Sequence, residues 1–400
     1  MDSDNNIGLI ELGNVKTKCL ISSSSNDSES LSTALIKTEG VHNGVIVNHA
    51  NASKMIRSCI GMAEKKAKVS LKKINVIIEQ PEFLCTKFSK HKKIDGAKIE
   101  AEDIKFLLSE GKKQASLNDG KQSIIHIFNH NYLVDGKKFV DEPIDVFADY
   151  LSHEMTFITM PKNNIKNINK VFLDCDIEVE RFFSCTFALG AKLLSERELQ
   201  SGSLLIDLGF EKVSIGIFKN LALIHSATFP VGFNHVTKDI SKVCSLTIDE
   251  ADNIKNEIDF SFKDNSKLFD ENGYLKNTYF KSSTFRKISQ AMVLDVVRAR
   301  IDEIFQMTKK QIFDLGLNLI CSENIYIVGG GSHATNLENY CSNFFKNNVK
   351  KKFIDDENFA SCLGALKIIK HGWETEAIPE SINENTKKVS IFSRFFRGKF

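Results

Sequence analysis

The sequence LIELGNVK at residues 9–16 is followed 196 residues later by LIDLGFEK at residues 205–212, about half a chain away. Each copy has an apolar run, an acidic residue, a glycine and a lysine at matching positions, and each continues into a second strand-like run. Internal repeats are sought first because they fix the architecture. The repeat predicts two similar β-hairpins, each of which brings a carboxylate to the C-terminal end of a buried strand.

The two predicted hairpins have the chemistry of a polyphosphate clamp. A glycine-centred turn exposes backbone N–H groups that can bind phosphate oxygens, and Lys16 adds a positive charge. Glu11 and Asp207 suit Mg²⁺ held through water, because this ion keeps several waters and needs few carboxylates. A duplicated hairpin that binds no ligand is the alternative, and it stays open at this point.

A third glycine turn follows another buried strand. The run Ile325–Val328 is apolar, and Gly329, Gly330, Gly331 and Ser332 come directly after it. Glycines between a strand and a helix let the backbone approach a nucleotide closely and direct a helix N-terminus toward phosphate. A flexible turn is the alternative for the glycines alone, but three such turns after apolar strands form a stronger joint signal.

Length and composition exclude several classes of protein. The 400 residues exceed one ordinary domain, and the net charge of +2 lacks the basic excess of a nucleic-acid binder. Nine dispersed cysteines predict reduced thiols in a cytosolic protein rather than a disulfide scaffold or a zinc ribbon. We expect neither a secretory signal nor an apolar run of about 20 residues that could span a membrane.

Strand-like and helical runs alternate along the chain, which predicts an α/β architecture. By periodicity we expect strands at 7–12, 17–22, 31–37, 74–78 and 325–328 and helices at 51–68 and 284–314. The lysine-rich stretch 81–160, with a helix at 101–114, is predicted to be an inserted α+β subdomain. We expect a loose surface loop at 261–281 and a flexible linker at 373–386, since both are polar and lack periodicity.

The last 14 residues have the composition of a membrane-surface helix. Five of them are basic, and on a helical wheel the aromatic and aliphatic side chains share one half. A helix docked on the protein's own core or a nucleic-acid contact is the alternative. Lipid is favoured because the segment is terminal, follows a linker and carries charges of one sign. The predicted membrane residues are Ile391, Phe392, Arg394, Phe395, Phe396, Arg397, Lys399 and Phe400.

These turns, in this order, resemble those of the actin, sugar-kinase and heat-shock-protein-70 ATPase superfamily. Within it the chain resembles the FtsA family of actin-like bacterial cell-division proteins. The features are Glu11 where most of the superfamily has Asp, the segment Gly40–Ile46 and the basic tail. The insert at 81–160 resembles subdomain 1C of that family. The resemblance implies an actin-like ATPase fold, with two lobes around a nucleotide cleft.

The resemblance also implies a division of the chain into parts. It gives a lobe 1 core of 1–80, 161–195 and 366–372, an insert of 81–160, a lobe 2 core of 196–235 and 312–365, a subdomain 2B of 236–311, a linker of 373–386 and a membrane helix of 387–400.

Residue by residue, the resemblance assigns roles around one nucleotide. It implies a first phosphate loop of Glu11, Gly13, Asn14 and Lys16, a second of Asp207 and Gly209, adenine and ribose contacts by Asp252 and Lys255, and an adenosine loop of Gly329, Gly330, Gly331 and Ser332. Glu11 and Asp207 are the implied Mg²⁺ carboxylates. Two hinge helices are implied around Gly190 and Gly364. Subdomain 2B of such proteins receives the FtsZ tail, with Arg286, Lys287, Arg298 and Arg300 as candidates and internal salt bridges as the alternative.

The second phosphate loop departs from the superfamily pattern. Phe210, Glu211 and Lys212 stand where two glycines and a threonine are usual. Phe210 restricts the backbone and Glu211 repels phosphate unless it is turned away, whereas Lys212 offers a compensating charge. Because phosphoryl transfer depends on positioning and charge stabilisation, we predict ATP binding with slow or absent hydrolysis.

The resemblance implies a cell-division scaffold on the cytoplasmic face of the inner membrane, at the division site. Expected partners are the FtsZ C-terminal peptide, further copies of the chain in a filament, anionic lipid, and other division proteins through the insert. Expected cofactors are ATP and Mg²⁺. A pilus-assembly adaptor of the PilM type and a small-molecule kinase of the same superfamily are the alternatives. The kinase would need a catalytic Asp base, and the sequence offers no convincing one.

Overall fold

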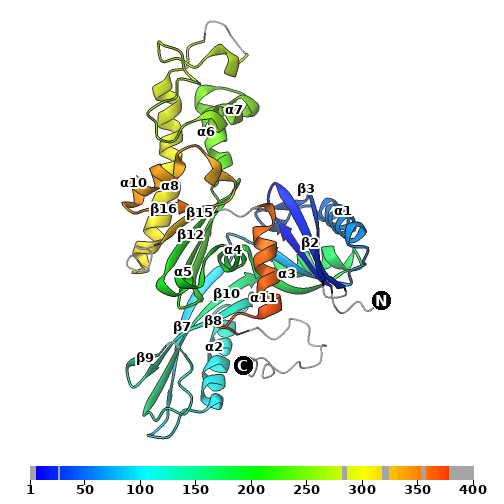
Figure 1. Ribbon diagram of the computed structural model, residues 1–400, viewed down its shortest axis with the longest axis vertical. Helices are drawn as coiled ribbons and strands as arrows, with labels where there is room; N and C mark the ends of the chain where they lie inside the picture. Colours follow the sequence, from blue (N-terminus) through cyan, green and yellow to red (C-terminus); the bar gives the residue numbers. More distant parts are fainter. Residues whose placement is uncertain are drawn as a thin grey trace.

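The computed structural model describes residues 6–25, 28–139, 141–281, 286–317, 324–352 and 357–377. Two five-stranded sheets form the centres of two lobes, and a third sheet belongs to an inserted subdomain (Figure 1). The predicted α/β architecture with an inserted α+β subdomain is confirmed.

The sheets of the two lobes have the same topology. In lobe 1 the order is β11-β6-β1-β2-β3, and in lobe 2 it is β16-β15-β12-β13-β14. In each, three consecutive strands pair antiparallel and the other two add in parallel beside the first. The lobe 1 strands are β1 (Ile7–Leu12), β2 (Lys16–Ser25), β3 (Ser28–Lys37), β6 (Lys73–Ile78) and β11 (Glu178–Ser184). The lobe 2 strands are β12 (Ser203–Leu208), β13 (Val213–Lys219), β14 (Ala222–Phe229), β15 (Ile325–Val328) and β16 (Val349–Lys351).

The repeat predicted from the sequence is a repeat of structure, down to its register. Leu12 pairs with Thr17 across the first hairpin, and Leu208 pairs with Val213 across the second. Each turn therefore contains four residues, and each acid occupies the penultimate position of its strand. Parallel strands end at the same edge, so the turns, the end of β6 and the end of β15 gather at one side of each sheet.

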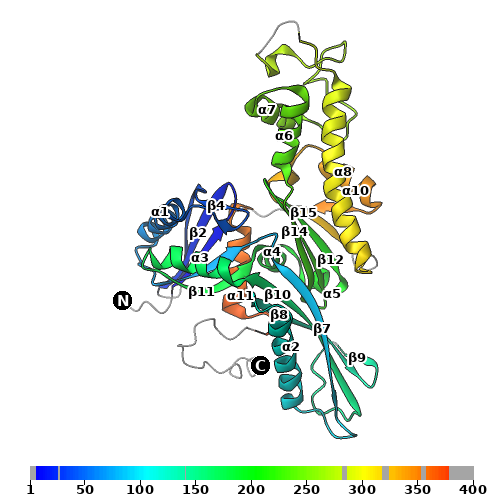
Figure 2. The same cartoon turned by 180° about the vertical axis from the view of Figure 1, so that it is seen from behind.

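Helices cover the sheets and join the lobes. Lobe 1 has α1 (His49–Ala67), α3 (Lys162–Leu173) and the small hairpin of β4 (Val41–His42) and β5 (Val45–Ile46). The short α5 (Glu196–Ser201) precedes β12. The helices α4 (Cys185–Leu193) and α11 (Ala360–His371) lie at the middle of the molecule in both views (Figures 1 and 2).

The insert is a sheet with one covering helix. Its strand order is β17-β8-β10-β7, in which β17 is Glu376–Ala377 from near the end of the described chain. The helix α2 packs with Gly111 against Met155 and Phe157. It extends away from both lobes at the bottom of Figure 1. Its elements are β7 (Leu84–Lys93), α2 (Ala101–Asn118), β8 (Gln122–Val134), β9 (Lys137–Phe139) and β10 (Tyr150–Pro161).

A helical arm extends from lobe 2 at the opposite end (Figure 1). The long helix predicted at 284–314 begins at residue 290, because the Ser289 hydroxyl accepts a hydrogen bond from the Met292 N–H and caps it. The elements that belong to or adjoin the arm are α6 (Phe233–Cys244), α7 (Ile248–Glu257), η2 (Asn277–Tyr279), α8 (Gln290–Asp314), η3 (Gly330–His333) and α10 (Leu337–Phe345). The short η4 (Glu357–Phe359) leads into α11 and contacts β2 of lobe 1.

The segment 261–281 is irregular, as predicted, but it is not loose. Four of its apolar side chains are buried and hold the segment against the rest of the protein: Leu268, Phe269, Leu275 and Phe280. Periodicity could not reveal this, because the four residues follow no helical or strand repeat.

The predicted linker at 373–386 is wrong at its first residues. The Trp373 ring N–H donates to the Leu221 carbonyl at 2.6 Å, and β17 (Glu376–Ala377) pairs with β8 of the insert. Composition suggested a linker, but residues 373–377 are fixed by the pairing of Glu376 and Ala377 with β8 and by the buried side chain of Glu376. Among the described helices, none is long and apolar enough to cross a membrane. The predicted membrane residues lie outside the described part of the chain.

Candidate functional site

The two repeat turns have matching tight geometry. A β-carbon on Gly13 would lie 2.6 Å from the Lys16 carbonyl oxygen, and one on Gly209 would lie 2.6 Å from the Lys212 carbonyl oxygen. Neither turn therefore accepts a side chain at its first residue without moving backbone atoms. This explains why glycine follows the acidic strand end in both copies.

The first acid, Glu11, is already paired. The Lys18 ammonium donates to its two carboxylate oxygens at 2.9 and 3.0 Å, and the Ser361 hydroxyl of α11 donates to one of them. Burial alone would lower the pKa of Lys18, but the adjacent carboxylate outweighs it and raises that pKa. Lys16, which was predicted to offer its charge to phosphate, is exposed at the start of β2 and is not the lysine that pairs with Glu11. Cross-strand pairing of 11 with 18 is the signal that sequence reasoning missed.

The second acid, Asp207, lies at the same place from the other lobe. Its burial and the charge of Glu11 raise its pKa to about 6, from an ordinary 3.8. A β-carbon on Gly329 would overlap the Asp207 carboxylate, so the glycine turn of β15 rests directly on it. Asp207 therefore lies against Gly329 and close enough to Glu11 to feel its charge.

The third turn leaves room above its backbone. Gly329 has φ of 81°, and an added β-carbon on Gly330 would meet nothing within 4 Å. Gly331 contacts the Phe233 ring at the start of α6, and the Ser332 hydroxyl donates to the Gly329 carbonyl at 2.7 Å. The turn is rigid on one side and open on the other, which is what close approach of a nucleotide needs.

The altered second loop directs its charges in two directions. Glu211 turns toward α6, where it accepts from the Asn234 amide and pairs with Lys238 at 3.1 Å. Phe210 is 43% exposed. The Lys212 ammonium reaches across to lobe 1 and donates to the Glu79 carbonyl. The sequence analysis expected Glu211 to repel phosphate unless it is turned away, and here its carboxylate is bound by Asn234 and Lys238 of α6.

Glu79 is a second residue that sequence reasoning missed. It directly follows β6 and is buried, and one carboxylate oxygen accepts from the Ser184 hydroxyl and the Thr186 N–H, both at 2.9 Å. The Thr228 hydroxyl of β14 donates to the other oxygen at 3.4 Å. Glu79 thus sits at the N-terminus of α4 and contacts both lobes. Its position after the buried strand 74–78 was the available signal.

The remaining predicted nucleotide residues have partners of their own. Both polar atoms of the Asn14 amide bond Asn43, at 2.8 and 2.7 Å, which ties the first turn to the β4–β5 hairpin. Asp252 pairs with Lys255 at 2.6 Å on α7 and accepts from the Thr237 hydroxyl of α6. These contacts hold α6 and α7 together beside the glycine turn.

The two central helices meet through small residues. A β-carbon on Gly364 of α11 would overlap the Ala188 carbonyl of α4, and one on Gly190 would overlap the Phe218 ring of β13. The close crossing predicted for the hinge is therefore present, with backbone against backbone.

The residues present suit a nucleotide better than a directly bound metal. No group of three or more His, Cys, Asp and Glu in the described ranges is arranged to hold a metal ion. Glu11 is neutralised by Lys18, whereas Asp207 is desolvated beside another carboxylate. A cation held mainly by water and phosphate, with Asp207 nearby, fits this set.

The four basic candidates for a partner site differ in exposure and in their contacts within the protein. Arg300 pairs with Asp239 at 2.6 Å, and Arg286 donates to the Ser245 carbonyl at 2.8 Å, so both join α6 to α8 or to the segment before it. Lys287 and Arg298 are exposed, and each lies over an aromatic ring, Tyr274 and Phe262 respectively.

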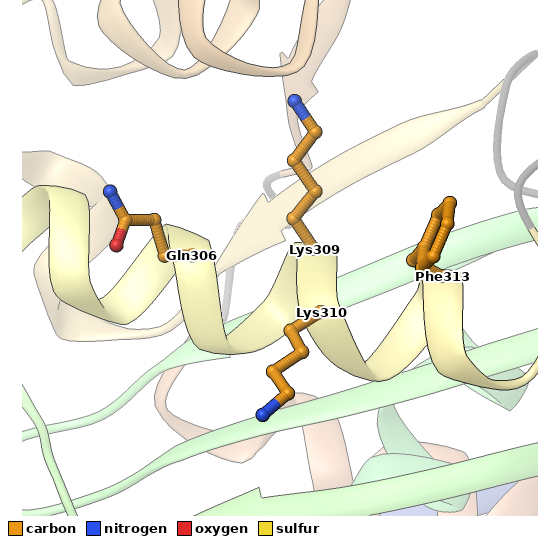
Figure 3. A pocket seen from close by; sticks show the side chains of 4 residues that line it. All are labelled: Gln306, Lys309, Lys310 and Phe313. Atoms are coloured by element: carbon orange, nitrogen blue, oxygen red, sulfur yellow. The ribbon is translucent and has the colours of Figure 1, made fainter.

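A shallow pocket on α8 lies away from this site. Gln306, Lys309, Lys310 and Phe313 line it, and the two lysines point away from each other (Figure 3). It contains none of the predicted nucleotide residues.

Family models match two parts of the chain. The model for the cell division protein FtsA matches residues 204–364, and the model for the SHS2 domain inserted in FtsA matches residues 84–159. Together the two matches cover more than half of the chain.

Relatives named cell division protein FtsA occur in distant bacteria. That of Agrobacterium fabrum is 23% identical, over 86% of this chain and 80% of its own length. That of Bacillus subtilis is 22% identical, over 85% and 77%. That of Borreliella burgdorferi is 23% identical, over 91% and 90%.

Solved structures share the fold at low identity. The protein of the PilM–PilN type IV pilus biogenesis complex aligns with a TM-score of 0.62 and 13% identity, covering 91% of this chain and 98% of its own. MreB5 of Spiroplasma citri bound to ADP aligns with a TM-score of 0.54 and 11% identity, covering 92% and 97%. The fold is therefore the actin-like ATPase fold.

Proposed function

The chain belongs to the FtsA family of cell division proteins, and from this premise we propose that it is an ATP-binding scaffold that tethers FtsZ filaments to the cytoplasmic membrane. One observation carries the proposal: two acidic turns of matching register converge from opposite lobes beside the glycine turn of β15. Such a site can hold a polyphosphate from two sides.

In this proposal different residues of the chain bind the phosphates, the adenosine and the Mg²⁺ ion. The turns at Gly13 and Gly209 offer backbone N–H groups to phosphate, with Asn14 and Lys16 beside the first. Gly329 to Ser332 hold the adenosine, together with Asp252 and Lys255. Mg²⁺, when bound, offsets phosphate charge and is held through water by Asp207 and Glu11. MreB5 of Spiroplasma citri with ADP or AMPPNP supports a nucleotide in this fold.

Hydrolysis is slow or absent in this proposal. The second loop lacks the small residues and hydroxyl of the superfamily pattern, and Phe210 occupies its tip. The Glu79 carboxylate, the closest acid to the N-terminus of α4, accepts hydrogen bonds from Ser184, Thr186 and Thr228. These donors occupy three of its roughly four acceptor sites, which leaves it little capacity to orient a water molecule.

Nucleotide titration tests the site. The full chain should bind ATP saturably in Mg²⁺, and Asp207→Asn should weaken binding by at least about tenfold, because it removes the carboxylate nearest the cation. The difference between the two proteins should shrink in EDTA. Asp95→Asn, on an exposed turn of the insert, is the matched control. Failure of the unaltered chain to bind ATP would refute the nucleotide site.

The FtsZ tail is proposed to bind on the helical arm. Lys287 and Arg298 are its exposed contacts, while Arg286 and Arg300 hold the surface in shape through α6. Pull-down with the FtsZ C-terminal peptide should be lost when Lys287 and Arg298 are both changed to Glu. The matched control changes Lys309 and Lys310, at the other end of α8, to Glu. Equal loss in both variants would exclude a specific surface.

Membrane attachment is proposed to depend on residues 387–400. Each basic residue near an anionic surface adds on the order of 1 kcal/mol, and the phenylalanines bury apolar area. The full chain should sediment with anionic vesicles and fail to do so without residues 387–400 or with neutral vesicles. A PilM-type adaptor, the alternative function, would sediment equally with and without the tail.

Self-association into an actin-like filament, with the insert also contacting other division proteins, completes the proposal. Pelleting of the full chain on anionic vesicles should increase with ATP. Asp207→Asn should remove this increase while leaving attachment to the vesicles unchanged. An increase that does not depend on nucleotide would separate assembly from the cleft.

A further inference from the structure

We propose that Lys212 is a crossbridge between the lobes whose ammonium moves to the terminal phosphate of a bound nucleoside triphosphate. In this role the side chain favours triphosphate over diphosphate and links occupancy of the cleft to the contact between the lobes. The inference deepens the proposed nucleotide site and rests on it.

The contact spans the two lobes. Lys212 ends the turn between β12 and β13 of lobe 2, and its ammonium donates to the Glu79 carbonyl after β6 of lobe 1. The charge of Lys212 also acts on Asp207, whose pKa it lowers against the raising effects of burial and Glu11. The ammonium therefore lies beside the cleft acids rather than on the outer surface.

The acceptor of this bond is rigid and neutral. The Glu79 side chain is fixed by donors from α4 and β14, so its carbonyl has little freedom to follow a moving lysine. The other cleft lysine, Lys18, is bound by the full charge of Glu11. Because an ammonium binds an anion more strongly than a neutral carbonyl, Lys212 is the cleft lysine that a phosphate can recruit.

The loop that carries Lys212 is fixed by its neighbours. Phe233 and Asn234, at the start of α6, donate backbone N–H groups to the carbonyls of Gly209 and Phe210 at 3.0 and 2.8 Å. Gly232 packs against the same turn, because a β-carbon added to it would lie 2.6 Å from the backbone nitrogen of Lys212. With the backbone held, the long Lys212 side chain is the part that can change partners.

The repeat gives an internal comparison. Lys16 occupies the equivalent place in the first turn, yet it is exposed, whereas Lys212 is half-buried. The same turn thus presents one lysine to solvent and the other across the cleft. Glu211, which would oppose phosphate, is bound by Asn234 and Lys238 of α6, whereas Lys212 reaches toward lobe 1 with its positive charge.

Titrations of the full chain with Mg-ATP and with Mg-ADP test the crossbridge. Lys212→Gln should weaken ATP binding by about tenfold or more and ADP binding by less than about threefold, since one charge-assisted hydrogen bond to the terminal phosphate is lost. Lys212→Arg, which keeps the charge, should retain a preference for ATP. Lys66→Gln is the matched control, because Lys66 donates to the Thr33 carbonyl within lobe 1 at 2.6 Å.

The outcomes separate this inference from the nucleotide site itself. Equal weakening of ATP and ADP by Lys212→Gln, or no change in either, would overturn the crossbridge while leaving the site standing. Lack of saturable binding by the unaltered chain would contradict the proposed function and the crossbridge together. Thermal melting of each variant without nucleotide identifies a folding defect, and Lys212→Arg then decides the question.

Discussion

Gly364 of α11 lies against the carbonyl of Ala188 in α4, so closely that a β-carbon on the glycine would overlap that oxygen. The helix α4 comes from the middle of the chain and α11 from its C-terminal part, and the two meet at the centre of the molecule (Figure 2). The contact is backbone to backbone, which makes it sensitive to a single methyl group and allows a direct test of the crossing.

Gly364→Ala should lower the free energy of unfolding by about 3 kcal/mol, because the helices must separate to admit the methyl group. Urea denaturation measures this. The control is Gly61→Ala in α1, where an added β-carbon meets nothing within 4 Å. That change should raise stability by about 0.5–1 kcal/mol, as alanine does in an open helix position. Equal effects at the two sites would rule out the close crossing.

Lys18→Met should lower the free energy of unfolding by about 3 kcal/mol in the absence of nucleotide. The change leaves Glu11, whose side chain is only 12% exposed, without its cation. Adding Glu11→Gln to Lys18→Met should recover part of the loss, because the uncompensated charge is gone. Denaturant curves of the two single variants and the double variant form the cycle. Additive losses would show that the pair is not coupled.

Glu376→Ala should loosen the strand that precedes the C-terminal residues. Glu376 accepts from His126 at 2.5 Å and pairs with Arg181, and its side chain is 2% exposed. Its removal leaves Arg181, whose side chain is only 18% exposed, without its carboxylate, at a cost of about 3 kcal/mol. Emission of Trp373, the chain's single tryptophan, should shift to the red as its ring leaves Phe187 and Leu221.

Glu374→Ala, two residues earlier at an exposed position, is the control for this change and should leave both stability and emission as they were. Hydrogen exchange in β8 gives a second measurement, since β17 pairs with that strand. Unchanged emission in Glu376→Ala would mean that Trp373 is held independently of the buried glutamate.

Stability should fall in acid partly through Glu198. Burial opposes ionisation of this residue, but hydrogen bonds from Lys352, Tyr326 and Ser195 outweigh it and lower its pKa to about 2, from 4.5. The unfolded chain therefore takes up this proton at a higher pH than the folded one. The contribution is complete above about pH 4.5 and is lost as the pH falls toward 2.

Denaturation midpoints of the unaltered chain and Glu198→Gln, measured between pH 2 and 6, check this assignment. The two curves should lie furthest apart near pH 6 and approach each other as the pH falls. A constant separation would assign the acid sensitivity to other carboxylates.

Much of the fold could be predicted from local patterns in the sequence. Strands 7–12 and 325–328 were predicted at their observed bounds, because a buried strand shows as an uninterrupted apolar run that ends at a glycine turn. The helix at 284–314 was predicted six residues too early, because its true cap, Ser289, lies within a polar stretch that has no apolar contrast. Helix limits depend on side-chain caps, which periodicity does not show.

Some residues of the site could likewise be predicted from local sequence patterns, and others could not. Glu11, Asp207 and the glycines were found because a repeat marks them, and their neighbours in sequence fix the turns. Lys18, Glu79 and Ser361 escaped, because their importance comes from pairing across strands and between lobes. The hairpin register could have indicated the pairing of Glu11 with Lys18, but no spacing along the chain reports the contacts of Ser361 or of Glu79 with lobe 2.

By itself the sequence determined the two acidic turns, the glycines that permit them and the succession of strands along the chain. These features depend on residues that are close together in the chain. Only the tertiary structure decided which lysine meets Glu11, where Glu211 and Lys212 point, and that residues 373–377 are docked rather than free. Those outcomes depend on side chains from distant segments that compete for the same acceptors, and only the packed lobes bring the competitors together.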